Sequence, residues 1–109
     1  MKEEPNIDYI VKLVGYDNEL KARLIELLVT EFPEDVETYK KNINLVNYKL
    51  AAENVHKLNH KVALLGYEKE YAMAQEYEQQ LKEDIVVNKE RFEELLKNIQ
   101  IFLNHLQNN

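Results

Sequence analysis

Glycine and proline, the residues that most readily end helices, are scarce in this chain. Its 109 residues include only two glycines and two prolines, whereas Leu, Glu, Lys and Ala, which favour helices, are abundant. Through long stretches, apolar residues recur at steps of three and four, a spacing that places them on one face of a helix. The sequence therefore predicts an all-α protein whose helices are joined by short connections.

Helix-capping residues and breaks in the periodicity divide the chain into five expected helices. A short helix follows Asn6 and stops at Gly15, and a long helix capped by Asp17 runs to about Asn44 with a kink before Pro33. The other three are expected at about 48–65, capped by Asn47 and ended by Gly66, at 67–83, and at 89–106, capped by Asn88. Short connections force neighbouring helices to run antiparallel. We therefore predict a single domain, residues 1–109, folded as an antiparallel up-down-up-down four-helix bundle with a short extra N-terminal helix.

The helix at 48–65 carries a histidine opposite its apolar stripe. The stripe consists of Leu50 or Ala51, Val55, Leu58, Val62 and Leu65. At about 100° per residue, His56 lies at the middle of the opposite, solvent-facing side. Its expected neighbours on that side are Ala52, Asn59, His60 and Ala63. The small alanines would leave the His56 ring approachable.

The helix at 67–83 has a stripe richer in tyrosine and alanine than in leucine. Its members are Tyr71, Ala74, Tyr77, Glu78 and Leu81. Such a helix can pack closely while its phenol hydroxyls stay at the wet edge of the core.

Charge and composition exclude several classes of function. The net charge of −6 opposes binding to nucleic-acid phosphates, and cysteine is absent, so neither a disulfide nor a thiolate metal site is possible. No apolar stretch approaches the roughly 20 residues of a membrane span, and no apolar run follows the first residues. We expect a cytoplasmic monomer that contacts neither nucleic acid nor membrane.

The segment around His56 is locally basic within an acidic chain. From Asn47 to Leu65, the three lysines Lys49, Lys57 and Lys61 stand against Glu53 alone, which leaves a local charge of +2. A phosphoryl group would be favoured there, although a solvated lysine face without a special role has the same composition.

These residues resemble the histidine-containing phosphotransfer (HPt) domains of bacterial multistep phosphorelays. The family pattern is a small or apolar residue, the phosphorylated His, any residue, Leu, Lys and Gly, then a short run ending in Leu-Gly. Val55–Leu58 and Leu65–Gly66 fit that pattern, with the histidine ten positions before the glycine. Asn59 stands at the family's lysine position and His60 at its glycine position.

The resemblance implies that His56 is phosphorylated. An exposed imidazole with a pKa of about 6.5 is largely neutral at pH 7 and has a ring nitrogen free as nucleophile. The phosphoryl group would be supported by Asn59, His60, Lys57 and Lys61, and the receiver would dock over Ala52 and Ala63. His60 can instead obstruct docking, or be only another exposed polar residue.

The resemblance also implies the partners. A phosphocarrier of this family takes a phosphoryl group from the aspartate of one receiver domain, in a hybrid sensor histidine kinase, and passes it to a response regulator. It is not an enzyme and has no cofactor, because the receiver supplies the Mg²⁺. Two alternatives remain open: an HPt-like interaction module that binds receivers without being phosphorylated, and an unrelated helical adaptor.

Glu53, His56 and His60 also have a spacing found in metal-binding helices. Di-metal bundles need a second Glu-x-x-His motif facing inward from another helix, and none occurs in this sequence. We therefore predict no metal site, although a solvent-facing histidine pair can bind Zn²⁺ or Ni²⁺ weakly.

Overall fold

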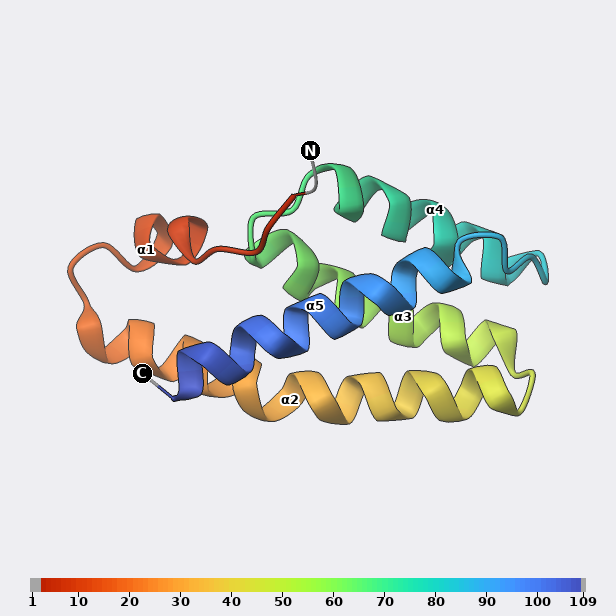
Figure 1. Cartoon of the computed structure of the whole chain (residues 1–109), viewed down its shortest axis with the longest axis horizontal. Helices are drawn as coiled ribbons and strands as arrows, with labels where there is room; N and C mark the ends of the chain where they lie inside the picture. Colours follow the sequence, from red (N-terminus) through yellow and green to blue (C-terminus); the bar gives the residue numbers. More distant parts are fainter. Residues whose placement is uncertain (1–2, 109) are drawn as a thin grey trace.

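The computed structural model describes residues 3–108, and every element of regular secondary structure within that range is a helix (Figure 1). The five helices are α1 (Asp8–Val14), α2 (Asn18–Asn44), α3 (Tyr48–Leu64), α4 (Lys69–Lys82) and α5 (Lys89–Gln107). The all-α prediction is thereby confirmed. Each helix lies close to its expected position, and the largest shift is the later start of α4, at Lys69 rather than Tyr67.

Several helix ends have the expected chemistry. The Asp17 side chain accepts a hydrogen bond from the Leu20 amide at 2.9 Å, which caps α2. Gly66 follows the end of α3 with φ of +87°, a conformation that costs glycine little. α2 remains a single helix through Pro33.

Two expected caps are wrong in detail. Asn47 and Asn88 occupy the N-cap positions of α3 and α5, but neither side chain caps its helix by a hydrogen bond. The side-chain Nδ2 of Asn88 instead donates to the backbone carbonyl oxygen of Met73 at 3.4 Å, because tertiary packing places that acceptor within reach.

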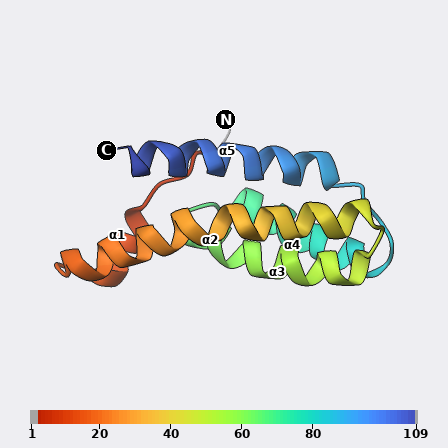
Figure 2. The ribbon, with the colours of Figure 1, turned by 90° about the horizontal axis from the view of Figure 1, so that it is seen from below.

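The chain runs back and forth along the long axis of the molecule. In Figure 1, α2 (orange to yellow) and α4 (green to cyan) run toward the right, and α3 and α5 run back toward the left. α3 packs between α2 and α4, whereas α5 packs on α2 and α4. Figure 2 shows α5 on one side of the other long helices, so α3 and α5 lie on opposite sides of the bundle.

The core contains the predicted stripe of α3. Val55, Leu58, Val62 and Leu65 are completely buried, while Leu50 is half exposed and Ala51 takes its place. Burial of this stripe against two neighbouring helices orients α3, because rotating the helix would expose four apolar side chains at about 1.5–3 kcal/mol each.

A hydrogen-bonded tyrosine pair joins three helices inside the core. The hydroxyls of Tyr39 (α2) and Tyr77 (α4) lie 2.6 Å apart, and the Tyr39 hydroxyl also donates to Glu93 Oε2 of α5 at 3.0 Å. Both rings contact Phe92. The expectation that the phenol hydroxyls of α4 stay at the wet edge is therefore wrong for Tyr77, because Tyr39 supplies the partner that a buried hydroxyl needs.

The segment before α1 is fastened to the start of α4. The Glu3 carboxylate accepts hydrogen bonds from three consecutive backbone amides, those of residues 68, 69 and 70, at 2.8–3.0 Å. Burial tends to raise the pKa of Glu3, but these three amides outweigh it and the pKa is lowered. Next to this contact, the Asn6 amide donates to the Leu65 carbonyl, and the Asn6 side chain would clash with any Cβ at Gly66.

Candidate functional site

His56 projects from the middle of α3 on the side away from the core. Its side chain is 64 % exposed. The solvent-facing position predicted from the helical period is therefore correct. The ring is open to a macromolecular partner, and its two nitrogens contact Glu78 and His60.

A buried carboxylate from α4 holds that edge. Glu78 Oε1 and Oε2 lie 3.1 and 3.2 Å from His56 Nδ1. Glu78 is only 9 % exposed because it belongs to the core-facing stripe of α4. A buried carboxylate needs a hydrogen-bond donor, and Nδ1–H of His56 supplies it. The contact therefore favours the tautomer whose Nε2 carries the free lone pair and points away from Glu78.

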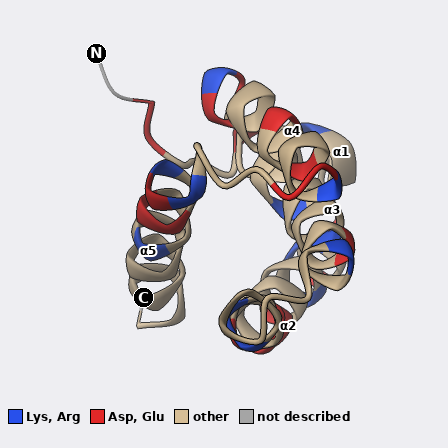
Figure 3. Cartoon of the chain, turned by 90° about the vertical axis from the view of Figure 1, so that its right-hand side faces the viewer, with Lys and Arg blue, Asp and Glu red and all other residues tan. Residues whose placement is uncertain are grey.

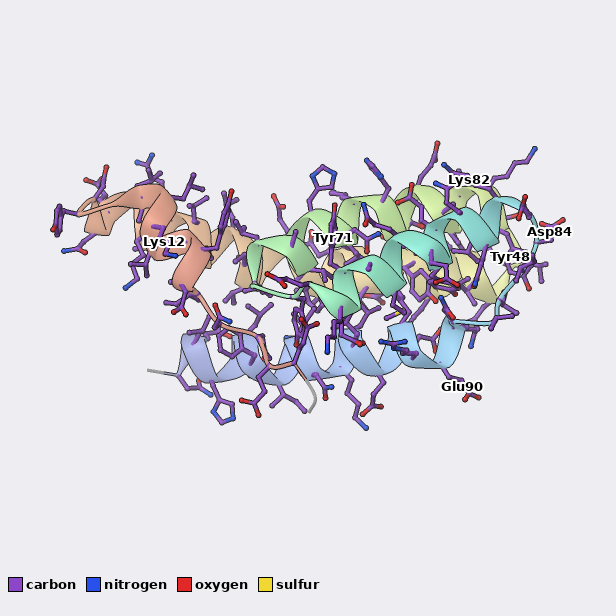
Figure 4. All side chains as sticks on the ribbon, turned by 90° about the horizontal axis from the view of Figure 1, so that it is seen from above. Lys12, Tyr48, Tyr71, Lys82, Asp84 and Glu90 are labelled. Carbon is purple, nitrogen blue, oxygen red and sulfur yellow. The ribbon has the colours of Figure 1, made fainter. Side chains whose placement is uncertain are left out.

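A lysine one turn along α4 contacts the same carboxylate. Lys82 Nζ lies 3.7 Å from Glu78 Oε2 and is half exposed. Figure 4 shows Lys82 toward the C-terminal end of α4, on the part of the molecule formed by α3 and α4. Lys82 is therefore the cation linked most directly to the His56–Glu78 pair.

His60 lies one turn after His56 and faces it. The two Nε2 atoms are 3.4 Å apart, and the ring centroids are 5.0 Å apart with the planes inclined at 73°. His60 is exposed. The free nitrogen of His56 thus has a second imidazole nitrogen as its nearest neighbour.

The two lysines expected to serve a phosphoryl group are engaged elsewhere. Lys57 Nζ lies 3.1 Å from Asp35, and Lys61 Nζ lies 2.9 Å from Asp35 and 3.3 Å from Glu31. The hydrogen bond and negative charge of Asp35 raise the pKa of Lys57. Acidic residues of α2 therefore offset the local positive charge read from α3 alone; Figure 3 shows charges of both signs along α2.

Two of the residues expected around His56 are not on the surface. Ala52 is 1 % exposed and Asn59 is 3 % exposed, so the prediction that they lie beside His56 on the solvent face is wrong. The reason is that α3 packs against helices on both sides, which buries a wider arc than one stripe. Ala63 is exposed as expected. Among the described residues, neither polar atom of the Asn59 side chain has a hydrogen-bond partner.

Sequence reasoning placed Glu78 in a core stripe but did not pair it with His56. The available signal was a carboxylate among buried positions, which requires a partner. Asp35 was missed because an ordinary acidic residue on α2 has no local mark of its contact with α3. No group of three or more potential metal ligands occurs within residues 3–108. His105 is exposed on α5, on the other side of the bundle from α3.

Comparison of the chain with models of known protein families, with curated protein sequences and with solved structures finds no significant match. In the part of the chain that the structure describes, no helix is long and apolar enough to cross a membrane. Function therefore has to be inferred from the geometry around His56.

Proposed function

We propose that this chain is a phosphorelay intermediate in which His56 accepts a phosphoryl group from a receiver-domain aspartate and passes it to another response regulator. In this proposal the chain is a single HPt-like domain, an up-down-up-down four-helix bundle with α1 as the extra helix. It acts as a cytoplasmic monomer between the receiver of a hybrid sensor histidine kinase and a response regulator. It is a carrier without kinase activity, and the receiver supplies Mg²⁺.

The observation that carries the proposal is the pairing of the exposed His56 with the buried Glu78. A nucleophilic imidazole needs one nitrogen with a free lone pair in reach of the partner, and a proton held on the other. Glu78 accepts from Nδ1 at 3.1 Å, so the lone pair is on Nε2, which lies 3.4 Å from His60 Nε2 in a ring that is 64 % exposed. A histidine with only a structural role would not need both an exposed ring and a buried carboxylate at Nδ1.

The transfer balances without any group beyond the two partners. The Nε2 lone pair of His56 attacks phosphorus in the aspartyl phosphate, the N–P bond forms, and the P–O bond to the aspartate breaks so that the aspartate leaves as a carboxylate. The positive charge that develops on the ring is stabilised by the Nδ1–H···Glu78 hydrogen bond. Transfer to the second receiver is the same step in reverse, with positioning and Mg²⁺ supplied by that receiver.

The residues expected to support the phosphoryl group differ in how easily they could reach it. His60 and Ala63 are exposed beside it and would meet the receiver, together with Lys82. Lys57 and Lys61 would have to leave Asp35 to reach a phosphoryl group. Asn59, being buried, would act through the packing of α3.

The direct test is phosphoryl transfer from a labelled receiver domain. The protein is incubated with a phosphorylated receiver and Mg²⁺, and an acid-labile, base-stable label is sought on the chain. We expect the label to be lost in His56→Gln and retained in the matched control His60→Gln. Glu78→Gln should slow transfer roughly tenfold through loss of one charge-assisted hydrogen bond. Label that survives His56→Gln but is lost in His60→Gln would show that His60 accepts the phosphoryl group, and would contradict the assignment to His56.

A second candidate is an interaction module that binds receivers without being phosphorylated. It is favoured by His60, whose Nε2 lies 3.4 Å from His56 Nε2, at a position where the resembling family has glycine. This alternative expects a measurable complex with a receiver but no label from any of several receivers. Restoring space with His60→Gly should then permit labelling if obstruction by the His60 ring is the cause.

A further inference from the structure

The two imidazole nitrogens of His56 and His60 are separated by the distance at which two ligands of one metal ion lie. Zinc–nitrogen bonds of about 2.0–2.1 Å at a tetrahedral angle of about 109° place the two nitrogens about 3.3–3.4 Å apart. The observed Nε2···Nε2 distance is 3.4 Å. A tetrahedral ion thus fits between the rings with little rearrangement of either side chain.

The environment of His56 matches that of a metal-ligating histidine in a second respect. Such a histidine usually donates its other ring N–H to a carboxylate, which fixes the ring and makes the ligating nitrogen more basic. Glu78 makes this contact with Nδ1 and is itself buried, so it cannot swing away into solvent. The proton of His56 is therefore kept on Nδ1, and its Nε2 lone pair lies beside His60 Nε2 before any ion binds.

We propose that His56 and His60 form an exposed Zn²⁺-binding pair, and that the bound ion blocks His56. Each ring donates an Nε2 lone pair and keeps its proton on Nδ1. Binding replaces any hydrogen bond between the two nitrogens, and water completes the coordination. With only two protein ligands the site is reversible. The metal site itself does not depend on the proposed function, whereas the block of phosphoryl transfer rests on it.

The chemistry of the site also determines which ions it rejects. Mg²⁺ prefers an octahedral set of oxygen ligands and loses water reluctantly, whereas imidazole suits Zn²⁺, Ni²⁺ and Cu²⁺. The Mg²⁺ required by a receiver domain would therefore not compete for the histidine pair. Because Zn²⁺ and the phosphoryl group use the same Nε2 lone pair of His56, their binding is mutually exclusive.

The first test is Zn²⁺ titration of the untagged full chain by calorimetry, with ¹H–¹⁵N spectra of the histidine rings. We expect one Zn²⁺ per chain with a dissociation constant below about 1 mM, shifts of Nε2 in both rings, and no response to Mg²⁺. His60→Gln and His56→Gln should each weaken binding at least about tenfold, and Glu78→Gln about 10–100-fold through loss of the carboxylate behind His56. The matched control His105→Gln should bind as the parent chain does.

Zn²⁺ affinity unchanged in His60→Gln, or the absence of saturable binding to the folded parent chain, would overturn the metal site. Circular dichroism checks that each variant is folded; both histidines are exposed, so their substitution should preserve the helices. The block is tested separately, by receiver-dependent labelling with and without Zn²⁺. Each chain is compared with its own labelling rate without Zn²⁺: Zn²⁺ should prevent labelling of the parent chain, whereas it should change the rate of His60→Gln little. If no labelling occurs even without Zn²⁺, the phosphocarrier proposal fails while the titration result still stands.

Discussion

The buried tyrosine pair offers a quantitative test of how the core is held together. Tyr39→Phe keeps the ring and its packing on Phe92 but removes the hydroxyl that lies 2.6 Å from Tyr77 and 3.0 Å from Glu93. Tyr77 is completely buried, so its hydroxyl is left without a partner at a cost of about 1–3 kcal/mol. Glu93 keeps its contact with Lys89 at 3.3 Å and should add little.

The reverse substitution should cost less. In Tyr77→Phe the Tyr39 hydroxyl still donates to Glu93, so we expect a loss of only about 0.5–1.5 kcal/mol. The double variant removes both hydroxyls and leaves none unpaired. Its loss should therefore be smaller than the sum of the single losses by about 1 kcal/mol.

The assay is urea unfolding followed by far-ultraviolet circular dichroism, with unchanged m-values as the control for two-state behaviour. Losses that add within about 0.3–0.5 kcal/mol would show that the two hydroxyls are not coupled and would refute the reasoning.

The tyrosine pair also predicts that the protein loses stability at alkaline pH. Burial raises the pKa of Tyr39, and raises that of Tyr77 to about 12 from the usual 10.0. Because the folded state holds these protons more tightly, this contribution is complete below pH 10 and is lost as the pH rises toward 12.

Two further predictions follow from the burial and capping of single residues. Leu58→Ala should cost about 2–5 kcal/mol in urea unfolding by leaving a cavity, whereas the exposed His56→Gln should cost less than about 0.5 kcal/mol; a large loss in His56→Gln would mean that this histidine is needed for the fold. Glu3→Gln should cost about 0.5–2 kcal/mol at neutral pH by weakening the cap of α4. Since the folded pKa of Glu3 is lowered from 4.5, its contribution should be present above that pH and disappear as the pH falls through the folded value, so parent and variant should converge in acid.

The helices could be predicted because their signals are local. Periodicity of apolar residues identifies which segments are helical, and Asp17 and Gly66 mark ends through contacts with their own neighbours in the chain. The predictions are wrong where a contact with a residue on another helix determines the structure. The Asn88 side chain donates to a carbonyl on α4 instead of capping α5, and the hydroxyl of Tyr77 can be buried because Tyr39, on another helix, provides its hydrogen-bond partner.

In the candidate site too, the features that depend on one helix could be predicted, and those that depend on contacts between helices could not. A helical period is enough to put His56 on the solvent side and Leu58 in the core, since both follow from the angle between residues of one helix. It cannot tell how wide an arc the neighbouring helices cover, so Asn59 was expected at the surface and is buried. Nor can it reveal that Glu78 and Asp35 reach α3 from opposite sides, where Asp35 holds Lys57 away while Glu78 holds His56 in place. The carboxylate of α4 thus leaves the imidazole nitrogen free, and the carboxylate of α2 withdraws a cation from it. A phosphoryl group at His56 would therefore depend on Glu78 more than on the lysines of α3, and a metal ion would depend on Glu78 and His60.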